Sequence, residues 1–126
     1  MRLLLDSHVA LWWLADDSTL GPSCRTMIAD ADEVLVSAVT PWELGIKRAL
    51  GKVDFPDDLV SALEGSGCSF LSITTAHAEQ APLLPAHHRD PFDRMLIAQA
   101  QLERAVLVSA DRSLRPYEVD LLDAGL

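Results

Sequence analysis

Two aspartates follow apolar runs of the kind that form buried strands. Asp6 comes directly after Leu3-Leu4-Leu5, and Asp111 lies just past Val106-Leu107-Val108. Short, continuous apolar runs are typical of strands in a parallel sheet, which is covered on both faces. Open parallel sheets bind their ligands outside the carboxyl ends of the strands. Both carboxylates are therefore candidates for chemistry at one edge of the sheet.

Two further acids stand in the first turns of expected helices. The stretches Thr40-Pro41-Trp42-Glu43 and Asp90-Pro91-Phe92-Asp93 share the order cap, proline, aromatic, acid. Thr40 and Asp90 are predicted N-caps, because their side chains can accept a backbone N–H, and proline suits the first helical position. Glu43 and Asp93 then fall near the positive end of a helix dipole. A purely structural role stays open for Glu43, as the partner of Thr40 in a capping box.

The convergence of four acids predicts a metal site. Four carboxylates at one edge repel one another, and a divalent cation relieves that repulsion. Oxygen ligands without a thiolate favour Mg²⁺ or Mn²⁺, and such ions activate water and stabilise charge on phosphate oxygens. Phosphoester hydrolysis is the natural chemistry of such a site. The predicted ligands and catalytic groups are Asp6, Glu43, Asp93 and Asp111.

The elements that must position these acids alternate along the chain. We predict strands at residues 3–5, 34–36, 70–73 and 106–108, with a further strand at 119–122. Helical segments are predicted at residues 9–14, 20–32, 40–51, 57–64, 75–81 and 91–104. This alternation indicates an α/β fold, a three-layer α/β/α sandwich with a four- to five-stranded, mostly parallel sheet. We expect one domain over residues 1–126.

Composition narrows the class of protein. Hydrophobic residues make up 49% of the 126 residues, enough for a core, and the formal net charge is −9. That sign argues against unaided, non-specific binding to a phosphate backbone. Cys24 and Cys68 are far apart and signal neither a zinc site nor a disulfide framework. No signal peptide or membrane span is indicated, so we expect a cytoplasmic protein with no membrane partner.

In its full length the chain resembles PIN-domain ribonucleases, specifically the VapC-like toxins of type II toxin–antitoxin pairs. The matching stretches follow the order of that family. They are Leu3 to Trp13, Val36 to Leu44, His87 to Ala100 and Leu107 to Arg112.

The resemblance implies an Mg²⁺- or Mn²⁺-dependent endoribonuclease that acts on RNA, forms homodimers and is silenced by a cognate antitoxin protein. By analogy, Asp6 and Asp93 are the principal metal ligands, and Asp111 binds directly or through water. Glu43 orients or deprotonates the attacking water, or serves a second ion. The supporting hydroxyls, at positions where the family often has threonine, are Ser7 and Ser109.

Several other polar residues flank the predicted site. Arg94 and Arg112 could contact phosphate, although each could instead pair with an acid of the cluster. Of these arginines, Arg94 is the preferred candidate. For His87 and His88 we favour solvated loop positions over contacts with RNA phosphate, because the pair has no metal-ligand spacing. The three tryptophans are expected in core or dimer packing rather than as base-stacking platforms.

Two alternative functions remain at this stage. A haloacid-dehalogenase-like phosphatase also has an aspartate after its first strand, but its second acid, two residues on, is replaced by His8. The chain also lacks room for that enzyme's cap domain. The other alternative is a catalytically silent module that binds antitoxin or RNA, with the acids serving as helix caps.

Overall fold

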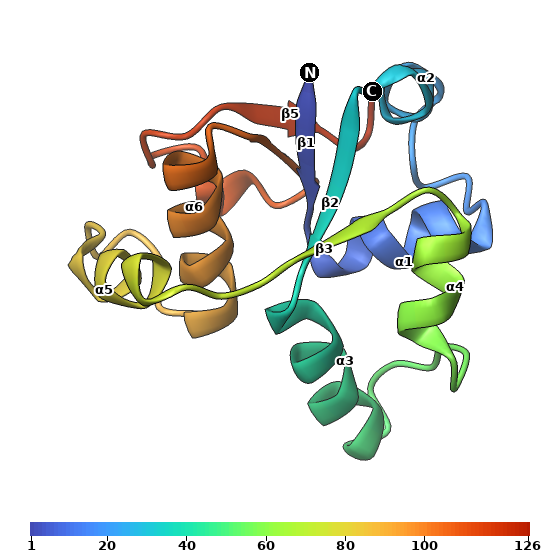
Figure 1. The fold of residues 1–126 in the computed structure, drawn as a ribbon, viewed down its shortest axis with the longest axis horizontal. Helices are drawn as coiled ribbons and strands as arrows, with labels where there is room; N and C mark the ends of the chain where they lie inside the picture. The colour runs from blue at the N-terminus through green and yellow to red at the C-terminus, as the bar shows by residue number, and fades with distance from the viewer.

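A five-stranded parallel sheet forms the centre of the computed structural model, which describes all residues 1–126 (Figure 1). The strand order is β3-β2-β1-β4-β5, and every pairing is parallel. The strands are β1 (Arg2–Leu5), β2 (Glu33–Ser37), β3 (Ser69–Leu71), β4 (Val106–Ser109) and β5 (Leu121–Asp123). The helices are α1 (Ser7–Ala15), α2 (Pro22–Asp30), α3 (Val39–Ala49), α4 (Leu59–Gly65), α5 (Thr75–Leu83) and α6 (Pro91–Glu103), with a 3-10 turn η1 (Arg112–Leu114).

Helices cover both faces of the sheet, and the side chains of β1 show how. Leu3 and Leu5 point to one face and pack with the buried residues of α1, α2 and α4. Leu4 points to the opposite face and packs with those of α5 and α6. All three leucines are fully buried, as expected for the central strand of a covered sheet. The predicted three-layer α/β/α sandwich is therefore confirmed.

The strand order places a crevice between β1 and β4. From β1 the chain moves outward to β2 and β3, and it then returns to the other side of β1 to form β4 and β5. The carboxyl ends of β1 and β4 thus lie at the point where the direction of winding reverses, the usual ligand position in open α/β sheets. Asp6 leaves β1 here, with its N–H bonded to the carbonyl oxygen of Val108 at 3.0 Å. None of the helices combines the length and apolar character that a bilayer crossing requires.

Candidate active site

Asp6 lies at the end of β1 and caps α1. Its Oδ1 accepts the Val9 N–H at 2.9 Å, and its Oδ2 accepts the Ser109 hydroxyl at 2.5 Å. Burial raises the pKa of Asp6, although both hydrogen bonds oppose that rise. Because burial disfavours the anionic form of this carboxylate, a bound cation would stabilise it.

Asp111 is tied to Asp6 through one hydroxyl. Ser109 Oγ, which donates to Asp6, accepts the Asp111 N–H at 3.0 Å. Asp111 Oδ1 accepts the hydroxyl and the N–H of Ser113, at 2.7 and 2.9 Å, and the hydroxyl bond is the main reason that its pKa is lowered. Its carboxylate stays ionised and half-exposed at the mouth of the crevice.

Asp93 projects from the first turn of α6, as the sequence predicts. Asp90 is the N-cap, and its Oδ1 accepts the N–H groups of Phe92 and Asp93 at 2.8 and 3.1 Å. Pro91 occupies the first helical position. Burial raises the pKa of Asp93 to about 6, and the negative charges of Asp90 and Glu43 add to the rise. The prediction that Asp90 has a structural role is confirmed.

The start of α3 differs from the prediction. The helix begins at Val39, and the Val39 N–H is accepted by Ser37 Oγ at 3.1 Å, so a serine at the end of β2 starts the helix early. Ala38 takes the cap position and no side chain caps it. Thr40 is therefore inside the helix, and both its predicted N-cap role and the capping box with Glu43 are wrong. Glu43 lies two residues further into the helix than expected, at its fifth position.

Glu43 nevertheless lies close enough to two other acids, Asp6 and Asp93, to act on them electrostatically. It is only 4% exposed; its Oε1 accepts the Ser7 hydroxyl at 2.5 Å, and its Oε2 pairs with Lys47 at 2.6 Å. Its negative charge contributes to the raised pKa of both Asp6 and Asp93, so the three carboxylates share one electrostatic environment. Both predicted hydroxyls contact an acid of the cluster, Ser7 at Glu43 and Ser109 at Asp6.

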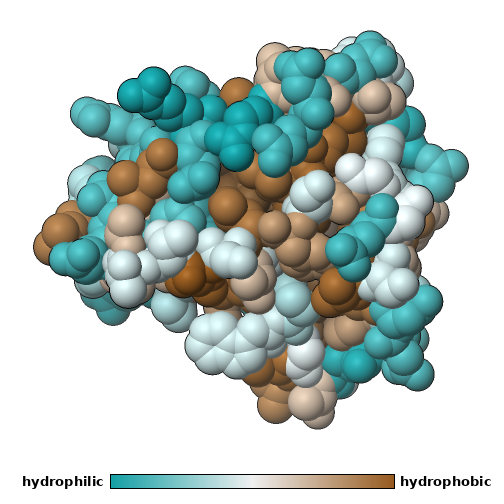
Figure 2. All heavy atoms as spheres, viewed as in Figure 1, coloured by the Kyte–Doolittle hydropathy of each residue, from teal (hydrophilic) through white to brown (hydrophobic).

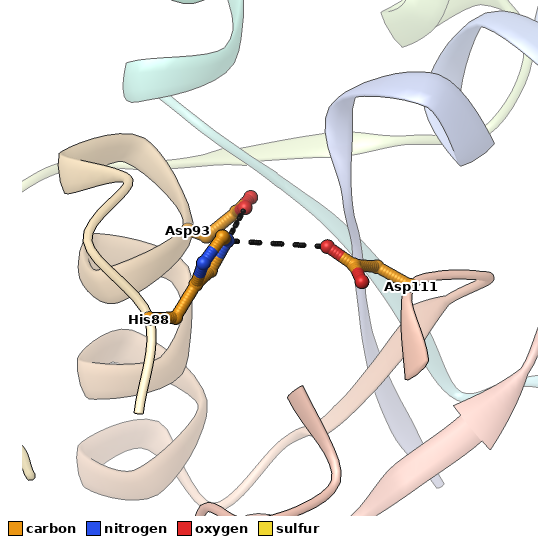
Figure 3. Close-up of side chains that lie close together, drawn as sticks. All are labelled: His88, Asp93 and Asp111. Carbon is orange, nitrogen blue, oxygen red and sulfur yellow. Dashed lines mark hydrogen bonds and ion pairs between the residues drawn. The ribbon is translucent and has the colours of Figure 1, made fainter. Parts of the chain in front are cut away.

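His88 belongs to this cluster, contrary to the solvated position that we favoured from the sequence. Its Nε2 is 2.7 Å from Asp93 Oδ2 and 3.9 Å from Asp111 Oδ2 (Figure 3). One ligand atom from each of these three residues lies within 4.8 Å of the others. The neighbouring His87 is exposed, and its ring meets that of Tyr117 edge to face at 5.1 Å. One feature of the sequence could have indicated this position: His88 stands two residues before Asp90, the N-cap of α6.

Arg94 is turned away from this cluster, and the prediction that it contacts phosphate is wrong. Its guanidinium donates to the Tyr117 hydroxyl and to backbone carbonyl oxygens of the segment that joins α5 to α6. The carbonyl acceptors are Ala81, Pro82, Leu84, Pro85 and His88, at 2.7 to 3.4 Å. A guanidinium that is committed to so many acceptors holds the segment in place and is not free for a ligand.

Arg112 differs from Arg94 in its surroundings. It follows Asp111 directly and is exposed, and its side chain forms no hydrogen bond or ion pair. With Asp111 and Arg115 it lines a shallow pocket beyond the carboxyl end of β4. The prediction that Arg112 contacts phosphate stays a prediction.

The donor set fits a divalent cation. Asp6, Glu43 and Asp93 bring three largely buried carboxylates together, and Asp111 adds a fourth at the rim. Lys47 is the one basic side chain paired within this set, apart from the titratable His88. Carboxylate oxygens are the ligands that Mg²⁺ and Mn²⁺ prefer, and such an ion would offset the burial and the repulsion that together raise the pKa of Asp93.

The fold and site define a class of protein, a parallel α/β domain with acids gathered at the β1–β4 crevice. The model of the PIN domain family matches residues 3–119, and the chain belongs to that family. This assignment removes the haloacid-dehalogenase-like alternative. A relative, Ribonuclease VapC22 from Mycobacterium tuberculosis, is 33% identical over 118 residues, which cover 91% of each chain.

Solved structures show the same fold. The structure of VapBC2 from Rickettsia felis bound to a DNA fragment has a chain that matches with a TM-score of 0.73 and 14% identity, over 98% of both chains. DNA-bound VapBC from Salmonella typhimurium matches with a TM-score of 0.71 and 17% identity, again over 98% of both chains.

Proposed function

We propose that this protein is a metal-dependent endoribonuclease that acts as the toxin of a type II toxin–antitoxin pair. The observation that carries the proposal is the gathering of Asp6, Glu43 and Asp93, all largely buried, at the topological switch point, where the charge of Glu43 acts on the other two. Its 33% identical relative is named a ribonuclease, which supports RNA as the substrate. A silent binding module does not need largely buried acids, two of which have raised pKa values through burial and the charge of the third, Glu43.

The side chains suggest a division of labour. Asp6 and Asp93 would hold Mg²⁺ or Mn²⁺, with Asp111 at the open side. The ion would supply activation of a water molecule and neutralise charge on the phosphate oxygens. Ser109 holds Asp6 and Asp111 in fixed positions relative to each other through its two hydrogen bonds. Glu43, held by Ser7 and Lys47, is placed to orient the attacking water or to accept its proton.

The proposal is tested by metal removal. Purified protein should cleave total RNA in Mg²⁺ or Mn²⁺, stop cleaving in excess EDTA, and recover when the ion is restored. Adding Mn²⁺ to the metal-free protein should also raise its melting temperature by linkage. Cleavage that continues unchanged in EDTA, or intact RNA under every metal condition, contradicts the proposal.

Arg112 is proposed to hold an RNA phosphate beside the scissile bond. It is free of protein partners and lies next to Asp111, so a guanidinium is available where the strand would leave the site. In a chain with a net charge of −9, such a local cation compensates for an acidic surface.

The proposed protein partners are a cognate antitoxin and a second copy of this chain. Trp42, Ile46 and Leu50 form an exposed apolar stripe along α3, with exposed fractions of 62%, 40% and 64%. Trp42 thus lies outside the core and meets Phe92 of α6 edge to face at 5.1 Å. Apolar surface is visible between the α5–α6 pair and α3 (Figure 2). We assign the stripe to the homodimer.

Trp42→Glu should convert a dimer into a monomer, because a carboxylate would then be buried among apolar side chains. Light scattering at matched concentrations measures the mass, and Val60→Glu, on the exposed face of α4, is the matched control. A monomeric wild-type protein, or a dimer that survives Trp42→Glu, overturns this assignment.

The antitoxin proposal predicts that a small protein encoded by the adjacent reading frame binds the chain and stops its RNA cleavage.

A further inference from the structure

The imidazole of His88 stands between two of the acids in the cluster. Figure 3 shows it reaching from the segment before α6 toward Asp93, with Asp111 facing it across the crevice. Its Nε2 is 2.7 Å from Asp93 Oδ2 and 3.9 Å from Asp111 Oδ2. The four-acid set that the sequence predicts contains no nitrogen ligand, so this contact adds a different kind of donor to the site.

The spacing of these atoms suits one ion. A small divalent ion in octahedral coordination binds its ligands at about 2.1 Å, which places cis ligands about 3.0 Å apart and trans ligands about 4.2 Å apart. The two distances from His88 Nε2 fall near these values, and the three ligand atoms lie within 4.8 Å of one another.

The backbone of His88 is fixed, whereas its ring can meet solvent. The His88 carbonyl oxygen accepts hydrogen bonds from Arg94 at 3.1 Å and from the Tyr117 hydroxyl at 3.3 Å. The side chain is 26% exposed, so an ion can reach Nε2 without opening the core. A held backbone with an accessible ring is the arrangement of a metal ligand, since the ring needs little ordering when the ion binds.

We propose that His88 is a nitrogen ligand of the catalytic ion, together with Asp93 and Asp111, and that it makes the site prefer Mn²⁺ to Mg²⁺. Mg²⁺ strongly prefers oxygen ligands, whereas imidazole binds first-row transition ions well. This inference rests on the metal site of the proposed function and names the ion that this particular chain selects.

The test measures metal binding without RNA. Calorimetry on metal-free protein gives the affinities for Mn²⁺ and for Mg²⁺, and pulsed electron paramagnetic resonance of bound Mn²⁺ detects a directly coordinated ¹⁴N. The wild-type protein should show the ¹⁴N coupling. His88→Ala should lose the coupling and about tenfold of the Mn²⁺ affinity, while its Mg²⁺ affinity changes by less than about threefold.

Two further variants make the result specific. His87→Ala removes the neighbouring imidazole, which packs on Tyr117 away from the acids, and should keep both the coupling and the ratio of affinities. His88→Gln keeps a side-chain amide that can still donate to Asp93, so it guards against a loss caused by local unfolding. It should lose the ¹⁴N coupling all the same, with an unchanged circular dichroism spectrum.

The outcomes separate this inference from the function on which it rests. Mn²⁺ that binds through Asp93 without ¹⁴N coupling, and with an equal loss of both affinities in His88→Ala, shows that His88 only orients Asp93. The ligand inference is then wrong, and the proposed nuclease stands. A wild-type protein that binds neither ion removes both the ligand inference and the metal-dependent function.

Discussion

Asp93→Asn should abolish RNA cleavage and at the same time make the metal-free protein more stable. The substitution removes the anionic oxygen that would hold the ion, so we expect the cleavage rate to fall by about a thousandfold or more. It also removes a charge that the fold disfavours, because burial and the neighbouring acids raise the pKa of Asp93 to about 6. Activity and stability should therefore change in opposite directions.

The direction of the stability change follows from the linkage between the ionisation of Asp93 and folding. In the unfolded chain the Asp93 carboxyl ionises near its ordinary pKa of 3.8, and in the fold near about 6. Below the lower value both states are protonated, and Asp93 costs the fold nothing. Ionisation costs stability progressively between the two values, and the full cost applies above about pH 6. Two pKa units correspond to about 3 kcal/mol at most, since the side chain is 23% exposed.

Urea denaturation in EDTA measures this cost. Asp93→Asn should exceed the wild-type protein in unfolding free energy at about pH 7.5, and the difference should vanish near about pH 4. Adding Mn²⁺ should stabilise the wild-type protein and leave the variant unchanged. Asp90→Asn is the matched control for cleavage, because asparagine also caps helices and the variant keeps the Asp93 carboxylate. Full cleavage activity of Asp93→Asn would contradict the assignment of Asp93 as a metal ligand.

The sequence predicted the start of α6 but not that of α3, for a physical reason. At α6 the signals are local, because Asp90, Pro91 and Asp93 each act within one turn. At α3 the Ser37 hydroxyl at the end of β2 begins the helix early, and the similar-looking Thr40 is left inside it. Two stretches with the same order of residue types therefore differ in structure, because one follows its strand directly.

Long-range contacts explain the other differences. The apolar runs predicted a parallel sheet, but the position of β4 beside β1 depends on packing over the whole chain. The approach of His88 to Asp93 requires the α5–α6 segment to fold back, and the Arg94 side chain fixes that path through backbone carbonyl groups. These acceptors are main-chain oxygens, which every residue has, so neither hydrophobic periodicity nor the spacing of a motif could have predicted the contacts of Arg94.

The second large effect concerns Arg94 and Arg112. Substitution of Arg94 should lower the stability of the fold, whereas substitution of Arg112 should weaken RNA binding and leave stability unchanged. Arg94→Ala leaves several carbonyl oxygens of the α5–α6 segment without their charged donor. Each hydrogen bond to a charged group contributes about 1.5–3 kcal/mol, and water replaces part of it at the surface, so we expect a loss of about 2–4 kcal/mol. Cleavage should fall as well, because this segment carries His88 and Asp90.

Arg112→Ala provides the comparison. Its side chain has no partner, so urea denaturation should give the unfolding free energy of the wild-type protein. Its affinity for a non-cleavable RNA should drop several-fold, and the slope of log affinity against log salt should become shallower by about one. Arg94→Lys keeps the charge but lacks the planar fork of donors, so its stability should stay close to that of Arg94→Ala. Equal stabilities for Arg94→Ala and Arg112→Ala would show that the α5–α6 segment is held by its own packing, and the structural role assigned to Arg94 would be wrong.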